Sequence, residues 1–282
     1  MKLNITTFRF NKIFILKGIL KFLPEKIIVL FLLYAFTMNV KGSEQESSSL
    51  SGDTILFSGY RWVAKDSYGK HTGPGNNYFS RSKDNVYLDA EGKLHLRITH
   101  RNEKWYCPEV RLIKNLGRGT YYFYLDPLPQ PLDKDIVIGL FLYDREDTSY
   151  FHKEIDIEIS QWGKDTSVNT QYVIQPKEDD AYRFQTDLSI GTKHTIELNK
   201  KRINFKSYYG IPDSNDIPLE YSNHVFERDY KYVLSTERIS INVWLNHTSE
   251  PSNLKEFEVI ISKFDFKPFW YDKFFKFLKK NE

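Results

Sequence analysis

The sequence of 282 residues contains a single cysteine, Cys107, so the chain cannot form an internal disulfide. Such a chain must be stabilised by its hydrophobic core, and this length allows one large β domain or two small ones. Cys107 lies in "WYCPEVRL", where we expect it to pack as a small apolar residue. No repeat, linker or low-complexity segment divides residues 50–268, which indicates one domain.

The sequence also has little that could cross a membrane. The apolar run "IIVLFLLYAFT", at 27–37, has 11 residues, which is too short for a helix that spans a bilayer core of about 30 Å. A basic stretch precedes this run and small polar residues follow it, a pattern typical of a secretory signal. We therefore expect residues 1–43 to be a signal peptide and the protein to be secreted, periplasmic or at the cell surface. A retained N-terminal membrane segment is the alternative.

The charge has no strong excess of either sign. Of the 40 basic and 37 acidic residues, seven basic and one acidic lie within 1–43, which leaves 33 basic and 36 acidic residues in the remainder. The basic character of the whole chain therefore belongs to the N-terminal segment. A net charge near −3 gives no support to a nucleic-acid partner.

Alternating apolar and polar residues recur throughout 44–268, separated by turn residues. The segment at 85–99, "NVYLDAEGKLHLRIT", predicts a hairpin with its turn at 89–92. Further strands are predicted at 119–125, 135–144, 152–160, 169–175, 193–199, 202–210, 238–246 and 255–268. Many strands at short spacing indicate an all-β sandwich or jelly roll. The basic, aromatic tail at 269–282 predicts a short helix that docks on the sandwich, or else an interfacial membrane helix.

The segment "EIDIEIS", at 154–160, carries acidic side chains at alternate positions. A strand places Glu154, Asp156 and Glu158 on one face and turns the intervening isoleucines into the core. Like charges on one face repel each other and raise the pKa of at least one carboxyl group. A carboxylate beside a carboxylic acid is what glycoside hydrolysis requires, so we take these three residues as the candidate catalytic group. A solvated charged strand and a calcium site built from carboxylates are the alternatives.

Aromatic and amide side chains flank this group in a way that suits a carbohydrate. Continued along the same face, the acidic strand reaches Trp162, and the strand at 238–246 alternates to place Asn242 and Trp244 together. Indole rings stack on sugar faces, and amides bind hydroxyls as donor and acceptor. Tyr143, in "GLFLYD", and Asn77, in "GPGNNYFS", are further candidate substrate-binding residues. For Asn77, simple turn chemistry is the alternative, and for each Trp, packing under a loop.

The acidic segment resembles the active-site signature of glycoside hydrolase family 16, E-x-D-x-E, found in the bacterial laminarinase, lichenase and agarase group. The resemblance extends over most of 50–268, through "DNVYLDAEGKLHLRIT", "GRGTYYFYL", "ISQWG", "QYVIQP" and "INVWLN". It implies a concanavalin A-like β-jelly-roll of two antiparallel sheets and a retaining endo-hydrolase of a β-linked polysaccharide. By position, Glu154 matches the nucleophile, Asp156 the assisting acid and Glu158 the general acid/base.

The resemblance leaves other matters open. The strand before the motif reads "GLFLYD", where well-studied members often carry tryptophan, so individual subsites and the substrate are not fixed. No cofactor is expected. Family members often bind a structural calcium, which the sequence does not place here. We expect a monomer whose partner is a polysaccharide or oligosaccharide. A non-catalytic carbohydrate-binding protein and a transglycosylase on the same fold are the alternative functions.

Overall fold

The computed structural model describes residues 54–175, 181–199, 202–210, 219–227, 236–246 and 250–269. These residues form strands and one four-residue helical turn, α3 (Ser149–His152). The strands are β1 (Thr54–Phe57), β2 (Tyr60–Ala64), β3 (Tyr78–Phe79), β4 (Val86–Leu88), β5 (Leu94–Arg101), β6 (Lys104–Cys107), β7 (Glu109–Leu112), β8 (Gly119–Leu125), β9 (Ile136–Tyr143), β10 (Ile155–Ser160), β11 (Thr170–Ile174), β12 (Tyr182–Phe184), β13 (Thr192–Leu198), β14 (Arg202–Tyr209), β15 (Leu219–Glu227), β16 (Arg238–Leu245) and β17 (Phe257–Pro268).

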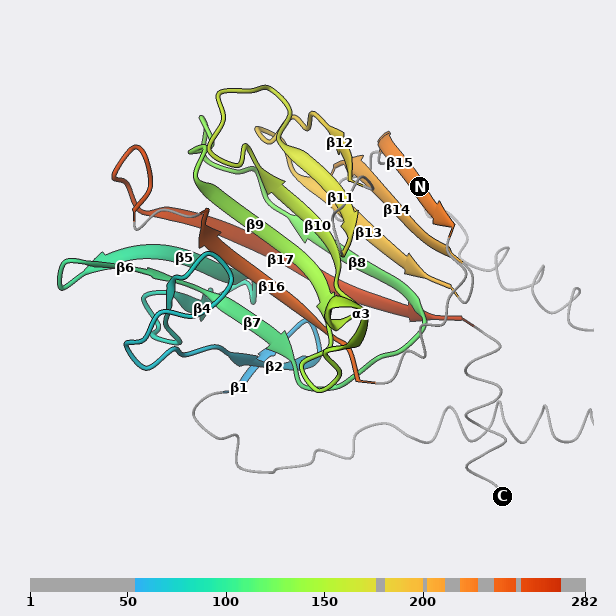
Figure 1. Cartoon of the computed structure of the whole chain (residues 1–282), viewed down its shortest axis with the longest axis horizontal. Helices are drawn as coiled ribbons and strands as arrows, with labels where there is room; N and C mark the ends of the chain where they lie inside the picture. Colours follow the sequence, from blue (N-terminus) through green and yellow to red (C-terminus); the bar gives the residue numbers. More distant parts are fainter. Residues whose placement is uncertain are drawn as a thin grey trace, which may run out of the picture. The chain divides into compact units, whose positions relative to one another are not determined.

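The strands form two sheets that pack face to face (Figure 1). One sheet has the order β1-β2-β7-β16-β9-β10-β11-β12, and the other has the order β15-β14-β13-β8-β17-β5-β6-β3 with β4 paired to β5. All pairings within these sheets are antiparallel except that of β3 with β6, which is parallel. The predicted all-β jelly-roll sandwich is therefore confirmed.

The core lies between the sheets and follows from the period of two in each strand. In β10, Ile155, Ile157 and Ile159 are fully buried in the apolar cluster, while the acidic residues between them lie on the opposite face. The strand β16 contributes its own apolar face to the same cluster. Each buried isoleucine stabilises the fold by about 1.5–3 kcal/mol, which offsets the repulsion among neighbouring carboxylates.

One detail of the secondary structure differs from the sequence prediction. The strand expected at 152–160 begins only at Ile155, because α3 and three residues with positive φ precede it. The hairpin at 85–99 forms as expected, with Leu88 opposite Leu94. The predicted helix in the tail lies outside the described residues, as does the N-terminal segment at 1–43. No helix among the described residues is long and apolar enough to cross a membrane.

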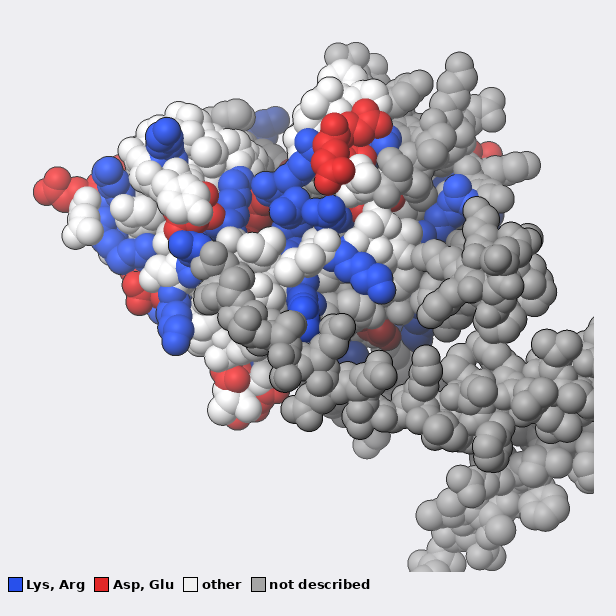
Figure 2. Space-filling model, turned by 90° about the horizontal axis from the view of Figure 1, so that it is seen from below, with Lys and Arg blue, Asp and Glu red and all other residues white. Residues whose placement is uncertain are grey.

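The surface of the described residues carries charges of both signs. In the view from below, Lys and Arg side chains gather near the middle of the face, and Asp and Glu side chains form smaller groups around them (Figure 2). The mixture is consistent with a formal net charge of only +3 for the whole sequence.

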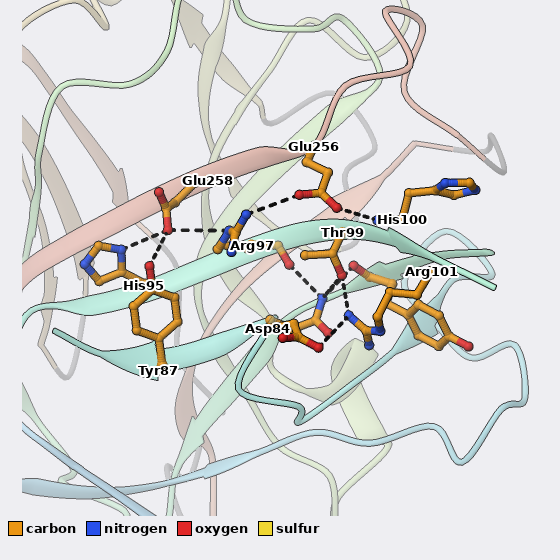
Figure 3. A network of polar contacts seen from close by, with 11 residues as sticks. Asp84, Tyr87, His95, Arg97, Thr99, His100, Arg101, Glu256 and Glu258 are labelled. Atoms are coloured by element: carbon orange, nitrogen blue, oxygen red, sulfur yellow. Dashed lines mark hydrogen bonds and ion pairs between the residues drawn. The ribbon is translucent and has the colours of Figure 1, made fainter. Parts of the chain in front are cut away.

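A polar network covers the outer face of β4, β5 and β17 (Figure 3). The ring of His95 contacts Glu258 through Nδ1 at 2.9 Å and Asp89 through Nε2 at 3.1 Å. Tyr87 donates a hydrogen bond to Glu258, and Arg97 lies 3.7 Å from the same carboxylate. Burial alone would lower the pKa of His95, but the hydrogen bonds to Glu258 and Asp89 outweigh it and the pKa is raised.

We expect His95→Gln to destabilise the protein more in mild acid than in mild base. Because the folded-state pKa of His95 lies above the ordinary 6.5, its contribution is fully present below about pH 6.5 and is lost as the pH rises through the raised value. The partners are partly exposed, so the difference in unfolding free energy is at most about 1 kcal/mol. Urea unfolding at pH 5.5 and pH 8.5 measures it. His100→Gln, which replaces an exposed histidine on the same strand, is the control variant.

Candidate active site

A cavity of about 500 Å³ lies on the outer face of the eight-stranded sheet, over β7, β16, β9 and β10. Its size is typical of a ligand site. It is lined by Lys65, Gly73, Pro74, Glu109, Gly139, Phe141, Tyr143, Arg145, His152, Glu154, Asp156, Glu158, Ser240, Asn242 and Trp244. The three acidic residues predicted from "EIDIEIS" therefore share one cavity, as do three of the five predicted substrate-binding residues.

The register of the sheet explains which side chains meet. Glu158 lies opposite Gly139 on β9, which in turn lies opposite Asn242 on β16 and then Glu109 on β7. Asp156 lies in the next row, opposite Phe141. Neighbouring strands are about 4.8 Å apart, so the row from Glu158 to Glu109 spans roughly 14 Å across the sheet.

Glu154 immediately precedes β10, and main-chain hydrogen bonds fix it on both sides. Its N–H donates to the carbonyl of Phe151 at 3.2 Å, and its carbonyl accepts from Gln175 N at 3.1 Å. Burial, together with the negative charges of Glu158 and Glu109, raises the pKa of Glu154 to about 7. Carboxylates that interact this strongly titrate as a pair, so near neutral pH the Glu154–Glu158 pair retains one proton.

Glu158 is held by a short relay of side chains. Gln171, fully buried on β11, donates from Nε2 to the Glu158 carboxylate. Its other amide atom, Oε1, accepts from Arg183 Nε at 3.0 Å, which fixes the orientation of the amide. The guanidinium of Arg183 lies 5.0 Å from the ring centroid of Trp162. The relay restricts the rotation of the Glu158 side chain toward β11.

The predicted substrate-binding residue Trp162 does not line the cavity, although its ring lies over Arg183, which is in the same row of side chains as Glu158 and Gln171. The strand β10 ends at Ser160, and Trp162 has a φ of +48° in the turn that follows. The period of two therefore no longer applies at this residue. Its contact with Arg183 supports the relay to Glu158.

Asp156, between the two glutamates, is almost fully buried. Gln175 Nε2 lies 3.4 Å from its Oδ2 and donates a weak hydrogen bond to it. Gln171 and Gln175 thus bring amide donors from β11 toward Glu158 and Asp156, which helps hold the carboxylates close together despite their repulsion.

Asn242 lines the cavity with a largely buried amide. Its side chain is 2% exposed, and its Oδ1 has no hydrogen-bond partner among the described residues. Unpaired buried polar atoms are rare, and this one packs against Gly139. Half-buried Trp244, two residues further along β16, offers its indole ring on the same wall.

Gly139 leaves room for this buried oxygen. A Cβ at this position would lie 2.5 Å from Asn242 Oδ1 and 3.4 Å from Phe141 Cδ1. We expect Gly139→Ala to displace the Asn242 amide and to raise KM for a glycan substrate about tenfold. The variant should also lose about 1–3 kcal/mol of unfolding free energy. Steady-state kinetics and urea unfolding measure the two effects. The double variant Gly139→Ala/Asn242→Ala should raise KM no further than Asn242→Ala alone.

Tyr143 and His152 form one end of the cavity wall. Their rings stack with centroids 4.5 Å apart and an interplanar angle of 17°. His152 Nδ1 lies 2.8 Å from the carbonyl oxygen of Asp144, so this nitrogen carries the proton that it donates. The neutral ring then has Nε2 as an acceptor. Tyr143 was predicted from sequence to bind substrate, whereas His152 was not.

Asn77 is a second correction, because it does not line the cavity. Its Nδ2 donates to the carbonyls of Pro74 at 3.0 Å and Leu245 at 2.9 Å, and its Oδ1 accepts from the Cys107 thiol. The turn chemistry considered as the alternative is therefore what the structure shows. The loop nevertheless forms the cavity rim through Gly73 and Pro74.

Glu109, Lys65 and Arg145 line the cavity but were missed by sequence analysis. Glu109 is 2% exposed, and its two oxygens contact Lys65 Nζ at 3.0 Å and an Arg145 nitrogen at 2.6 Å. Each residue comes from a different part of the chain, so no motif joins them. The available signal was the alternation in "EVRL", which places Glu109 and Arg111 on the face opposite Val110 and Leu112.

Among the described residues, no group of three or more His, Cys, Asp or Glu side chains is arranged to hold a metal ion. The acidic residues of the cavity therefore give no sign of the calcium site considered as an alternative for them. The structural calcium that family members often bind away from the cleft was not assigned to any site in this sequence.

No model of a known protein family matches the sequence, and no curated protein matches it significantly. Several solved structures, however, match the fold of this chain. The β-glucanase of Bacillus licheniformis superposes with a TM-score of 0.56 at 17% identity, covering 78% of this chain and 100% of that one. A β-1,3-1,4-glucanase (lichenase) derived from a mouse hindgut metagenome gives a TM-score of 0.55 at 18% identity, covering 78% and 95%.

The chain has the β-glucanase fold. A Bacteroides ovatus GH16 protein, solved in complex with a G4G4G3G product, shares this fold with a TM-score of 0.54 at 10% identity, covering 73% of this chain and 94% of that one. At these identities the likeness establishes the β-glucanase fold alone. The assignment of an activity must therefore rest on the residues in the cavity of this chain.

Proposed function

We propose that the protein is a retaining glycoside hydrolase of family 16 that cleaves internal bonds of a β-linked polysaccharide. The observation that carries the proposal is the meeting of Glu154, Asp156 and Glu158 in one cavity, where the pKa of Glu154 is raised to about 7 by burial and by its acidic neighbours. Such a pair supplies one carboxylate and one carboxylic acid at neutral pH, which are the two groups that retaining hydrolysis uses.

In this mechanism, Glu154 attacks the anomeric carbon as a carboxylate while Glu158 transfers its proton to the departing glycosidic oxygen. A covalent glycosyl-enzyme forms and the leaving sugar departs as an alcohol. Glu158, now a carboxylate, removes a proton from water, and the resulting attack releases the sugar and restores Glu154. Substrate binding favours the required protonation state, because a glycosidic oxygen beside Glu158 accepts a hydrogen bond only from the protonated acid.

The surrounding residues have distinct roles in the proposal. Trp244 and the stacked Tyr143 offer aromatic surfaces to sugar rings, and Asn242 lies on the same wall of the cavity. Gln171 and Gln175 orient Glu158 and Asp156. Glu109 already contacts two cations, so it can accept hydroxyl hydrogen bonds with little added negative charge in the cavity.

β-Glucans are the first substrates to test, because several proteins with the same fold are described as β-1,3-1,4-glucanase or β-1,3-glucanase. The experiment incubates the protein with mixed-linkage glucan, laminarin, xyloglucan, agarose, carrageenan and chitin-glucan, and measures new reducing ends. The proposal expects cleavage of at least one of these glycans, with the product released first as the β-anomer in NMR spectra. Initial release of the α-anomer, or binding without cleavage, would contradict it.

Transglycosylation uses the same residues and differs only in the acceptor that resolves the glycosyl-enzyme. Product analysis with and without added acceptor oligosaccharides distinguishes it from hydrolysis. A purely carbohydrate-binding role would not require the buried, proton-sharing pair, and it predicts that Glu154→Gln binds a glycan as the wild type does while neither protein cleaves it. We also propose, from the N-terminal segment, that the protein acts outside the cytoplasm, where polysaccharides are met.

A further inference from the structure

The segment before Glu154 has an unusual backbone. Phe151, His152 and Lys153 have φ values of +53°, +58° and +52°, so three successive residues other than glycine occupy the left-handed region. Each such residue costs roughly 1–2 kcal/mol, and left-handed residues normally occur singly. The segment lies between β9 and β10 and includes the last two residues of α3 (Figure 1). Its surroundings must therefore hold it in place.

A buried aspartate, Asp144, supplies much of this constraint. It is 0% exposed, and its Oδ1 accepts from the N–H groups of Glu146 and Asp147 at 3.0 Å and from Thr236 Oγ1 at 2.6 Å. These donors keep the carboxylate fixed within the loop. They leave Oδ2 to form an ion pair with a positively charged side chain of the left-handed segment.

The positively charged side chain is that of Lys153, the residue that precedes Glu154. Its side chain is 4% exposed, and Nζ lies 3.2 Å from Asp144 Oδ2 and 2.7 Å from Asp147 Oδ2. Burial alone would lower the pKa of Lys153, but the hydrogen bonds to the two carboxylates outweigh it and the pKa is raised. The ammonium group is thus charged and held at the base of the turn.

Two hydrogen bonds between Asp144 and His152 also connect the two ends of the segment. Asp144 N–H donates to the carbonyl of His152 at 2.8 Å, and the His152 ring donates back to the carbonyl of Asp144 at the same distance. The two ends of the segment are therefore joined by an ion pair and by two hydrogen bonds. Asp144, Asp147 and Lys153 do not line the cavity, so they can influence a glycan only through the residues they position.

We propose that Asp144 and Lys153 are positioning residues, whose ion pair locks the left-handed turn and thereby fixes the Glu154 carboxyl within the cavity. Without Lys153 the pair is broken, and the turn can relax toward ordinary backbone angles. Glu154 follows because its N–H is bonded to Phe151 inside the turn. A displacement of about 1 Å at a reacting group can reduce turnover about 10²-fold. This role in turnover rests on the proposed hydrolase function.

The test uses Lys153→Met and the milder Lys153→Gln, which retains a donor for Asp144 if the first variant folds poorly. Lys93→Met is the control, because Lys93 also contacts an aspartate, Asp126 at 2.6 Å, but lies in the β4–β5 hairpin of the other sheet. On a glycan that the wild type cleaves, kcat should fall about 10²-fold for Lys153→Met and less for Lys153→Gln, with KM within about threefold. The control should retain wild-type kinetics.

A second readout does not depend on activity. In carbon-13 NMR titration of the carboxyl groups, the pKa of Glu154 should move in Lys153→Met from about 7 toward the ordinary 4.5, because the relaxed turn exposes the carboxyl to water. An unchanged or higher pKa of Glu154, or an unchanged kcat, would overturn the positioning role. If the wild type cleaves no glycan, the hydrolase proposal fails, and the titration alone decides whether the ion pair positions Glu154.

Discussion

Replacing Glu154 by glutamine should abolish turnover, with a loss of at least about 10⁴-fold in kcat on any glycan that the wild type cleaves. The amide has nearly the same shape as the carboxyl group but cannot attack the anomeric carbon, so no glycosyl-enzyme forms. Because the cavity keeps its shape, glycan binding should change little. Reducing-end assays measure turnover, and isothermal titration calorimetry of the inactive variant measures binding.

The same variant should be more stable than the wild type at pH 8. The folded-state pKa of Glu154 is raised from 4.5 to about 7, so ionisation disfavours the folded state. The wild type therefore loses stability as the pH rises from about 4.5 to 7, and Glu154→Gln escapes this loss. Urea unfolding at pH 4.5 and pH 8 provides the comparison. Full turnover in Glu154→Gln would exclude Glu154 as the nucleophile.

Replacing Glu158 by alanine should reduce kcat on a natural glycan about 10²–10⁴-fold, because the departing sugar is a poor leaving group without a proton donor. An aryl glycoside carries a leaving group that needs no proton, so formation of the glycosyl-enzyme should be nearly as fast as in the wild type. Its breakdown should be slow, because water then lacks a base. A burst of released phenol followed by slow turnover is the expected kinetic result.

Added azide distinguishes this role from a structural one. Azide attacks the glycosyl-enzyme without a general base, so it should restore turnover of Glu158→Ala and yield a β-glycosyl azide. Glu154→Gln should show no such rescue with a β-linked aryl glycoside. Gln171→Ala is a useful companion, because it removes the donor to Glu158 but leaves the carboxyl group. An equal loss on glycan and aryl glycoside in Glu158→Ala would argue against an acid role.

The acidic strand shows why part of the site could be found from sequence. A period of two is a local property of extended backbone, so "EIDIEIS" by itself separates three isoleucines from three carboxylates. The core confirms one side of that separation. The same rule gives Asn242 and Trp244 on one face of β16, where both line the cavity. Local alternation within a strand predicts which residues share a face.

The rule is not sufficient where a strand ends. Extending the alternation two residues beyond Ser160 places Trp162 on the acidic face, and its indole does lie over Arg183 in the row of Glu158, but the backbone turns there and Trp162 does not line the cavity. Asn77 was placed by its amide chemistry, and its amide instead bonds main-chain carbonyls of the loop and of β16. A side chain's composition shows which hydrogen bonds it can make, but the neighbouring backbone decides which partner it finds.

The sequence by itself determined the strand character of most of the chain, the burial of one face of each strand and the grouping of the three acids, because these depend on residues two positions apart. Only the tertiary structure decided that Glu109, Lys65 and Arg145 meet these acids and that a buried Asp144–Lys153 pair supports Glu154. Such contacts depend on strand order and loop path. Pairing between segments that are distant in the sequence sets both, and the residues of a single strand do not specify which strands will lie beside it.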